Sequence, residues 1–503
     1  MIWIVAPAIV LAAALPGAAR AAPSEKAAVI VASASAPVFR SPRAAHGLLV
    51  PGEGATVTRR GALASLLSGE MGNALVNGGL PSGERRISID SRPGRTTFYV
   101  ALPPPGKHHN VVRYPIAVVG PGYGGLLTST ATHLRGLIAI ADVAPSVQAL
   151  ERGHRPRIRS RPSSTPLRYL DRLDHRLNRS HDARTGATLV LVGLLTAFGL
   201  LALAARRAVL GRAAFLVAPA CLVVALVLSA AGLTEPWQVI TVLGIVSAAL
   251  ALAGGVVLRP RLPLALGLGA VFVFLYAVMW AKPEWNSLAA LGPRPDGGGR
   301  FYGVNNQVAT LLLAPALVLG GLAGGGLPLV ALLVAGGMVA SFIGAQGDGL
   351  VVYLAGFAVL AVRLGGVRPG FGRAAAAVAV AAAAALALVA VDAATGGSSH
   401  ITQAFGGGPG SLAGHLGHRI HLSAAFVASR WYEALLFAAS VAGLVWLALR
   451  RPRLAVLDAL LVALAVSLVV NDTPTDIAGF GVLSGLVLWI WVRRSGERVG
   501  ALD

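Results

Sequence analysis

Cysteine and charged residues are both scarce in this sequence. The chain has one cysteine, Cys221, among 503 residues, and only 13% of the residues are charged. A single cysteine excludes an intramolecular disulfide, so any domain outside the cytoplasm must fold without one. The low charge, with 55% hydrophobic residues and a mean hydropathy of +0.71, excludes an ordinary soluble protein and indicates a chain that crosses a membrane several times.

Acidic residues are scarcer than basic ones. The chain has 21 Asp and Glu against 42 Lys and Arg, which gives a formal net charge of +21. In a membrane protein an excess of this sign favours contact with anionic lipid. No nucleic-acid recognition motif accompanies the charge. We therefore expect membrane lipids, and no nucleic acid, as partners.

Residues 1–22 form an apolar segment that ends in small residues. Its apolar core runs from Ile2 to Leu15, and Ala19-Arg20-Ala21 follows. This pattern is typical of a secretory signal peptide with an Ala-x-Ala cleavage site, although the segment has no basic residues at its start. A signal peptide and an uncleaved first membrane helix both remain open. Either one places the following residues outside the cytoplasm.

Residues 23–151 have a different character, with short β-branched runs between turns rich in glycine and proline. This mixture predicts a small extracytoplasmic α/β domain with a sheet that is at least partly parallel. Strands are predicted at 28–33, 86–90, 96–102 and 114–120, and short helices at 61–68 and 145–151.

Residues 152–186 form a strongly basic segment before the first predicted membrane span. Leu170, Leu173 and Leu177 recur at spacings of three and four, which is an amphipathic helix pattern. Such a helix would lie along the outer leaflet of the membrane. The alternative is a solvated linker in which Asp171 and Asp174 pair with arginines, and both interpretations remain open.

Residues 187–494 contain closely spaced apolar segments and predict a polytopic transmembrane domain, followed by a cytoplasmic tail at 495–503. The fold class is therefore a mainly α membrane protein, with about eleven transmembrane helices after the small α/β domain. The short segment 349–363 could also be re-entrant. Spans are predicted near 187–205, 213–233, 237–258, 262–281, 305–324, 327–344, 349–363, 374–392, 433–449, 455–471 and 476–492.

The arginines of the predicted loops are distributed unevenly between the two sides of the membrane. If the α/β domain is outside, roughly fourteen basic residues fall on the cytoplasmic side and five on the outer side. This bias follows the positive-inside rule. It places the α/β domain outside and the C-terminus in the cytoplasm.

The same topology places four polar loops on the outer face. They are LGPRPDGGGRFYGVNNQ at 291–307, GAQGDG at 344–349, the long loop 393–431, and NDTPTD at 471–476. Polar groups at the edge of the membrane or inside it are costly unless they face protein or a water-filled cavity. We therefore expect the loops to form an outward-facing polar pocket. The candidate catalytic residues are Asp348 and Asp472, and the candidate substrate-binding residues are Arg300, Tyr302, Asn305, Asn306, His415 and Asn471.

Each of these features also has a purely structural interpretation. Asn305, Asp348 and Asp472 are suitable helix caps. His415 and His418 have i, i+3 spacing, but no Cys or Glu completes a zinc pattern, so we expect no metal. The glycine-rich GGGPG at 406–410 lacks the Lys-Ser/Thr of a phosphate-binding loop, so no nucleotide or other cofactor is expected.

Two stretches of the N-terminal domain resemble the alkaline-phosphatase superfamily. Residues 111–150 resemble the closing part of those domains, in which a strand ends in Gly-Pro-Gly and a helix starts at Asp-x-Ala-Pro; here Asp142 opens that start and needs only a capping role. GATVTRRGALASLLSGE resembles the nucleophile helix, with Thr58 nearest the nucleophile position.

The metal ligands of that superfamily are not matched. Ala34-Ser35-Ala36 stands where an acidic residue is expected, and Gly106-Lys107-His108-His109 stands in place of Asp-His-Gly. Two divalent metals require several carboxylates. The resemblance therefore implies a shortened, metal-free pseudoenzyme domain.

The polar motifs of the C-terminal half resemble a set of uncharacterised bacterial membrane proteins that join such a domain to a multi-span region. Those proteins carry Gly-Arg-Phe-Tyr-Gly-x-x-Asn and Asn-Asp motifs, matched here by GGRFYGVNNQ and NDTPTD. Asn306-Gln307 departs from the more usual Asn-Glu, which removes a carboxylate. The resemblance implies a multi-pass protein of the bacterial plasma (inner) membrane.

Three functions remain open on the sequence alone. The leading hypothesis is a cell-envelope protein whose pocket handles an anionic lipid-linked or glycan-linked substrate, with Arg300 paired to its phosphate or carboxylate. If the protein is a transferase, Asp348 or Asp472 would act as the base. The alternatives are a transporter or flippase, whose polar residues line a path, and a non-catalytic membrane scaffold.

Overall fold

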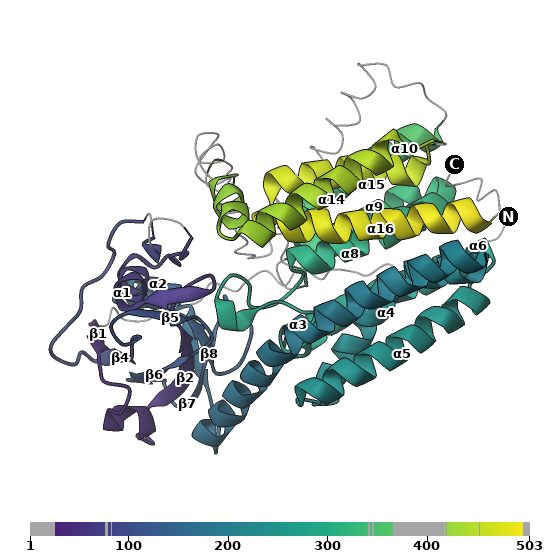
Figure 1. Cartoon of the computed structure of the whole chain (residues 1–503). Helices are drawn as coiled ribbons and strands as arrows, with labels where there is room; N and C mark the ends of the chain where they lie inside the picture. The colour runs from purple at the N-terminus through teal and green to yellow at the C-terminus, as the bar shows by residue number, and fades with distance from the viewer. Residues whose placement is uncertain are drawn as a thin grey trace.

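A small α/β domain lies at one end of a bundle of long helices (Figure 1). The computed structural model describes residues 26–75, 79–81, 83–340, 343–344, 347–365, 417, 420–451 and 453–495. The predicted segment at 1–22, the span at 374–392 and the tail at 495–503 fall wholly or almost wholly outside these ranges. Helix ends next to the α/β domain are called domain-side ends below, and the opposite ends are called distal.

The α/β domain is built on one mixed sheet. β1 pairs with β4 in parallel, and β2 pairs with β7 and β8 in parallel, whereas the remaining neighbours are antiparallel. The prediction of a partly parallel sheet is confirmed. Along the sheet the strands are β1 (Ala27–Val31), β4 (Thr96–Val100), β6 (Tyr114–Val119), β2 (Ala45–Val50), β7 (Gly125–Ser129) and β9 (Ile158–Arg161), with β8 (Leu137–Ala139) beside β2.

The strand predicted at 86–90 is wrong. The backbone amides of Arg86 and Ile87 bond to the carbonyl of Leu67 at the end of a helix, so this segment does not extend a sheet ladder. Asp90 at its end accepts a hydrogen bond from the Val29 amide through its carboxylate. Its contacts with neighbouring elements override the weak β pattern.

Two short helices cover the sheet, as predicted. α1 (Arg59–Ser68) begins after Thr58, whose hydroxyl accepts a hydrogen bond from the Gly61 amide at 3.0 Å. α2 is Val143–Glu151 and contacts α1. Leu66 and Val147 bury their side chains in one core with Phe98 of β4. A separate hairpin pairs β3 (Thr56–Thr58) with β5 (Lys107–His109).

α3 (Pro166–Ala205) is one continuous helix of 40 residues, which corresponds to about 60 Å. The amphipathic helix predicted from Leu170, Leu173 and Leu177 is present, and it continues without a break into the first apolar span. Leu173 and Leu177 are buried against Leu134 and Leu137 of the α/β domain, so the apolar stripe holds the domain to the bundle. The sheet also extends past residue 151, because β9 precedes α3.

In the described part of the chain, eight helical segments are long and apolar enough to cross a membrane. The expected count of about eleven is not confirmed. One of the eight, Asn306–Val339, joins two helices that contact each other, and α15, an apolar helix of 16 residues, is too short to be counted among the eight. The longer helices of the described residues after α3 are α4 (Ala208–Ala230), α5 (Pro236–Val257), α6 (Arg261–Ala281), α8 (Asn306–Ala323), α9 (Leu327–Val339), α10 (Gly347–Leu364), α14 (Trp431–Leu449), α15 (Ala455–Val470) and α16 (Pro474–Ser495).

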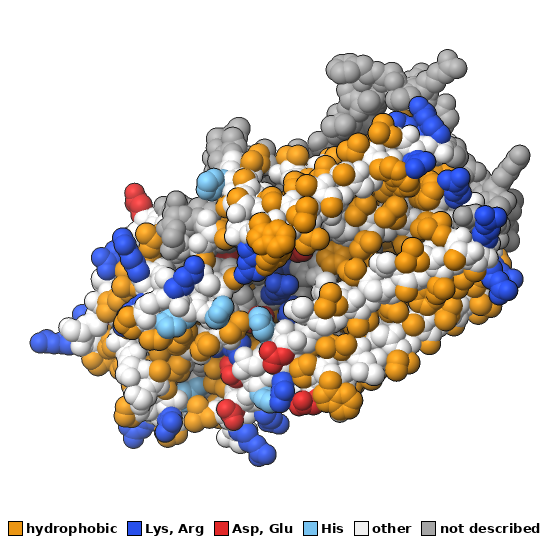
Figure 2. Space-filling view, viewed as in Figure 1, with side chains coloured by type: hydrophobic (Ala, Val, Ile, Leu, Met, Phe, Trp, Pro, Cys, Tyr) orange, Lys and Arg blue, Asp and Glu red, His pale blue; other side chains and the backbone are white. Residues whose placement is uncertain are grey.

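The sides of the bundle are apolar and its distal end is basic. Hydrophobic side chains cover the visible face of the helices, and Lys and Arg side chains gather at the end far from the α/β domain (Figure 2). Trp237, Trp280 and Trp431 are strongly exposed at the domain-side ends of α5, α6 and α14. Exposed tryptophans at one level are typical of a membrane–water interface.

Candidate functional site

The loop 291–307, called the mouth loop below, lies between the α/β domain and the bundle. On one side, the Asn110 amide donates to the carbonyl oxygens of Gly52 and Gly297, at 2.8 Å and 3.3 Å. The Gly54 amide also donates to Gly297 at 3.0 Å. Phe301 is buried in the same apolar cluster as the leucines of α3. The mouth loop is thus part of the contact that joins the two halves of the chain.

On its other side, the mouth loop is fixed to α3 by buried charge. Arg184 donates to the carbonyls of Gly292 at 2.9 Å and Pro293 at 2.6 Å. His181 bonds to the buried Asp296 carboxylate at 2.8 Å. Burial alone raises the pKa of Asp296, but the hydrogen bond with His181 and the charge of Arg184 outweigh it and hold that pKa below its ordinary value.

Arg300 and Tyr302 belong to the domain-facing side of the mouth loop. The Tyr302 ring lies 4.1 Å from the His133 ring of the α/β domain, measured between centroids. Arg300 is half-buried and follows Gly299, whose Cα faces the Glu53 side chain. These two candidates therefore lie where the domain meets the loop.

Asn305 is the N-cap of α8. Its side-chain oxygen accepts from the Val308 amide at 2.7 Å, and its amide group donates to the Gly292 carbonyl at 2.9 Å. Both ends of the side chain therefore have a structural role, which is the helix-cap interpretation given above.

Asn306 connects α8 to the residues before α16. Its amide group donates to the Asp472 carboxylate and to the Thr473 hydroxyl, each at 3.0 Å. The domain-side ends of α8 and α16 are both N-terminal ends, and the two helices contact each other. The positive ends of two helix dipoles therefore meet at one place.

Residues at or beside this meeting point contain three buried polar atoms without a hydrogen-bond partner among the described residues. They are Gln307 Nε2, Asn471 Oδ1 and Thr475 Oγ1. A buried polar atom without a partner costs about 1–3 kcal/mol, so several of them together indicate a place for another molecule. We call the surrounding set the mouth site: Asn306, Gln307, Asn471, Asp472, Thr473 and Thr475.

The sequence predictions named only half of the mouth site. Asn306, Asn471 and Asp472 were candidates, whereas Gln307, Thr473 and Thr475 were not. A signal for them exists, because they are polar residues in or beside the first turn of an apolar helix. Arg294, which is exposed on the mouth loop, was also overlooked as a candidate.

The loop before α10 also contacts the mouth loop. The Val304 amide donates to the Gly344 carbonyl at 2.8 Å, and Asp348 is half-buried in the first turn of α10. Ser423 donates to the Asn471 carbonyl at 2.9 Å, so the described end of the long loop 393–431 reaches the same region. His415 lies outside the described residues.

The two residues marked by the alkaline-phosphatase resemblance have structural partners. Thr58 caps α1, as described above. Asp142 is buried and makes no side-chain cap, contrary to expectation; it accepts from Ser129 and lies 3.6 Å from Arg157. Burial raises the pKa of Asp142, which Ser129 and Arg157 only partly offset. Within the described ranges, no group of three or more His, Cys, Asp or Glu is arranged to hold a metal ion.

No family model, curated protein or solved structure matches this chain. The function is therefore argued from the geometry of the mouth site.

Proposed function

We propose that this membrane protein binds an anionic lipid-linked or glycan-linked substrate at the mouth site. The observation that carries the proposal is the set of three buried polar atoms, Gln307 Nε2, Asn471 Oδ1 and Thr475 Oγ1, that lack a partner in the described part of the chain. Each is adjacent to the start of α8 or α16. A substrate that bonds to them would remove the cost of their burial.

The chemistry of the mouth site suits a substrate with both an anionic group and hydroxyls. Two helix N-termini and the amide of Gln307 favour an anion. The Asp472 carboxylate and the Asn471 oxygen are acceptors, which suit the hydroxyls of a sugar. A phosphate that links a sugar to a lipid combines both groups and would approach from the membrane.

A catalytic role for Asp472 or Asp348 is a further part of this proposal. Asp472 is half-buried and accepts one hydrogen bond from Asn306, so it has acceptor capacity left for a substrate hydroxyl. Asp348 starts a neighbouring helix, α10. The arrangement suits a transferase base, but binding alone does not require it.

Thr475→Val is the sharpest test of the mouth site. Valine has nearly the same shape and removes only the hydroxyl. Without a ligand the change should be neutral or stabilising, because no described partner is lost. If a ligand binds here, less of it should co-purify with the variant. We expect the amount of lipid-linked phosphate or glycan, measured by mass spectrometry, to fall about tenfold.

Ser247→Ala is the matched control, because it removes a buried hydroxyl of α5 that is not part of the mouth site. It should leave the lipid profile unchanged. Asn306→Ala is the second variant and should lose the same species as Thr475→Val. Identical profiles for the wild type, Thr475→Val and Asn306→Ala would exclude the mouth site as the binding site.

A transporter or flippase is the second candidate function. Helix N-termini aimed at an anionic group are also the substrate sites of many transporters, and the mouth site has two of them. Reconstituted vesicles distinguish the two functions. Movement of a lipid-linked substrate between leaflets, lost in Thr475→Val, would favour transport, whereas a chemically changed substrate would favour a transferase.

The α/β domain as a shortened relative of the alkaline-phosphatase superfamily is likewise a proposal. It is supported by Thr58 at the start of α1 and by the Gly-Pro-Gly that follows β6. The Thr58 hydroxyl is engaged as a helix cap. A non-catalytic domain that holds the mouth loop is consistent with these contacts.

We propose that the α/β domain faces the outside of the bacterial plasma membrane. The distal position of the basic loops supports this orientation. A cysteine at exposed Ser35 should react with an impermeant thiol reagent added to intact cells, and a cysteine at Gly365, at the distal end of α10, should not. Native Cys221 is buried, so labelling of the unmodified protein gives the background signal. The opposite labelling pattern would reverse the orientation.

A further inference from the structure

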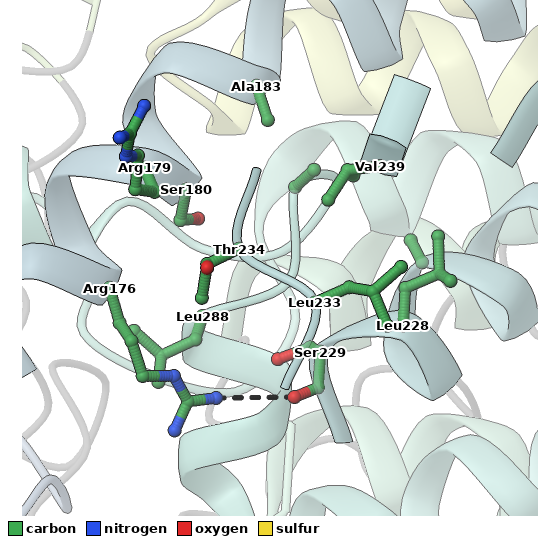
Figure 3. A pocket seen from close by; sticks show the side chains of 12 residues that line it. Arg176, Arg179, Ser180, Ala183, Leu228, Ser229, Leu233, Thr234, Val239 and Leu288 are labelled. Carbon is green, nitrogen blue, oxygen red and sulfur yellow. Dashed lines mark hydrogen bonds between the residues drawn. The ribbon is translucent and has the colours of Figure 1, made fainter. Parts of the chain in front are cut away.

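A pocket lies between α3, α4 and α5, away from the mouth site. It encloses about 360 Å³ of space, part of which is open to solvent. Of the residues expected from the sequence, the seven that the structure describes do not line it. Figure 3 shows the lining side chains, which come from α3, the end of α4, the α4–α5 turn, the start of α5 and the loop after α7 (Pro283–Ser287).

One wall of this pocket carries two arginines of α3. Arg176 and Arg179 are three residues apart on one face and both are half-buried. Arg176 reaches across the pocket and donates to the Ser229 carbonyl at 3.2 Å (Figure 3). A guanidinium has five N–H donors, so this bond leaves most of the donor capacity of Arg176 for a ligand.

The partner of Arg179 is easily replaced. Its guanidinium lies 3.4 Å from the Glu235 carboxylate, and the two side chains are 37% and 40% exposed. An ion pair with this exposure contributes about 0–1 kcal/mol. A phosphate can therefore take the place of Glu235 at little cost, with bidentate geometry that suits arginine.

Ser229 supplies an independent sign of a ligand. The residue is only 5% exposed, it lines the pocket, and its Oγ has no hydrogen-bond partner among the described residues. Figure 3 places it opposite Arg176. The neighbouring turn leads into α5, whose N-terminal end adds a positive dipole at the rim beside Thr234.

The rest of the pocket is apolar and continues onto the membrane-facing sides of the helices. Its floor is formed by Leu228, Leu233 and Val239. Beyond it, Leu189 of α3 and Ile245 of α5 are 66% and 67% exposed, as expected of side chains that face acyl chains. The pocket therefore joins an anion-binding rim to an apolar surface, and this combination fits an amphiphile rather than a free anion.

We propose that this pocket binds the phosphate of a membrane phospholipid. Arg176, Arg179 and the Ser229 hydroxyl hold the phosphate, and the acyl chains run along α3 and α5. The site is independent of the mouth site and of the substrate proposed for it. Because the α/β domain packs against α3, a lipid bound here also stabilises the helix that holds the domain to the bundle.

Native mass spectrometry of the full chain in detergent tests this proposal. Dioleoyl-phosphatidylglycerol is titrated against the wild type, Arg176→Gln and Arg172→Gln. Arg172 lies one turn away on the same helix, is exposed and does not line the pocket, so it is the matched control. We expect Arg176→Gln to weaken binding of the tightest-bound lipid about tenfold, and Arg172→Gln to leave it unchanged.

Two further arms identify the ligand. Dioleoylglycerol, which lacks the phosphate, should bind at least tenfold more weakly, and inorganic phosphate should not compete with the phospholipid. Ser229→Leu fills the pocket from α4 and replaces Arg176→Gln in the test if that variant does not fold. It should reduce lipid binding as much as we expect for Arg176→Gln. Equal phospholipid binding by the wild type and the pocket variants overturns the proposal, and so does competition by inorganic phosphate, which would indicate a free-anion site.

Discussion

Replacing Gly303 with alanine should displace the mouth loop and markedly destabilise the protein. Gly303 has φ +78, a conformation that strains any residue with a Cβ, and a Cβ there would overlap the carbonyl oxygen of Gly344. The residue is held on both sides: Asn286 donates to its carbonyl at 2.6 Å, and the next amide, of Val304, donates to Gly344 at 2.8 Å. Strain and overlap together cost on the order of 3 kcal/mol.

Thermal unfolding in detergent measures this effect, and we expect the apparent Tm to fall by roughly 3 °C. Gly299→Ala is the control within the same loop. It is exposed, has no strained φ, and a Cβ there would meet only the Glu53 side chain. The two variants should also differ in the amount of bound substrate, because the backbone of Gly303 helps to fix the start of α8 and the backbone of Gly299 does not. Equal Tm values for both variants would contradict the packing described for Gly303.

Replacing Arg113 with alanine should loosen the α/β domain from the bundle. The Arg113 side chain is 1% exposed and lies 2.7 Å from the Asp174 carboxylate of α3. It also donates to the Asn178 side chain at 2.7 Å and to the Val111 carbonyl at 2.6 Å. Removing one member of a buried pair is strongly destabilising, but Asp174 is 37% exposed and can be rehydrated, so we expect a loss of about 2–3 kcal/mol.

Hydrogen exchange at the start of α3 measures this loss, because undocking exposes Leu173 and Leu177 with their amides. Arg113→Lys should be almost as damaging, since one ammonium group does not reproduce the bonds of the planar guanidinium. Arg86→Ala is the control, because Arg86 forms an exposed ion pair with Glu70 and should cost less than about 0.5 kcal/mol. If exchange at α3 is the same in Arg113→Ala and Arg86→Ala, the buried pair does not hold the domain.

The two predictions concern successive parts of one structure. Arg113 fixes the α/β domain to α3, and Arg184 of α3 fixes the mouth loop through the carbonyls of Gly292 and Pro293. The mouth loop in turn leads to Asn306 and the mouth site. Undocking of the domain should therefore also alter the mouth site, so bound substrate should fall in Arg113→Ala as well as in Thr475→Val.

The general architecture could be predicted from the sequence because it depends on composition and local periodicity. Long apolar runs form helices wherever water is excluded, and β-branched runs between glycine-rich turns form strands. Three of the four predicted strands and both short helices of the α/β domain are present. The segment 86–90 failed because the backbone amides of Arg86 and Ile87 bond to Leu67, so that only its end, at Asp90, bonds to β1 through the Val29 carbonyl. The path of α3 was missed because Leu173 and Leu177 have a partner surface that is distant in sequence.

The mouth site was only partly predictable, because its pairings are not local. The sequence indicated that polar loops gather at one end of the bundle, and Asn305 as a helix cap was one of its interpretations. The bond between Asn306 and Asp472 joins residues that are 166 positions apart. Composition does not specify such a pairing, and neither does it show which polar atoms lack one.

The sequence by itself determined that this chain is a membrane protein with a small α/β domain, because apolar length and charge scarcity are properties of the chain alone. Only the tertiary structure decided which polar residues share a site. Burial determines this: a hydroxyl or amide such as those of Thr475 and Gln307 becomes informative once its neighbours exclude water and leave it without a partner in the described part of the chain. The pocket at Arg176 and Ser229 exists for the same reason, since it forms only where α3, α4 and α5 meet.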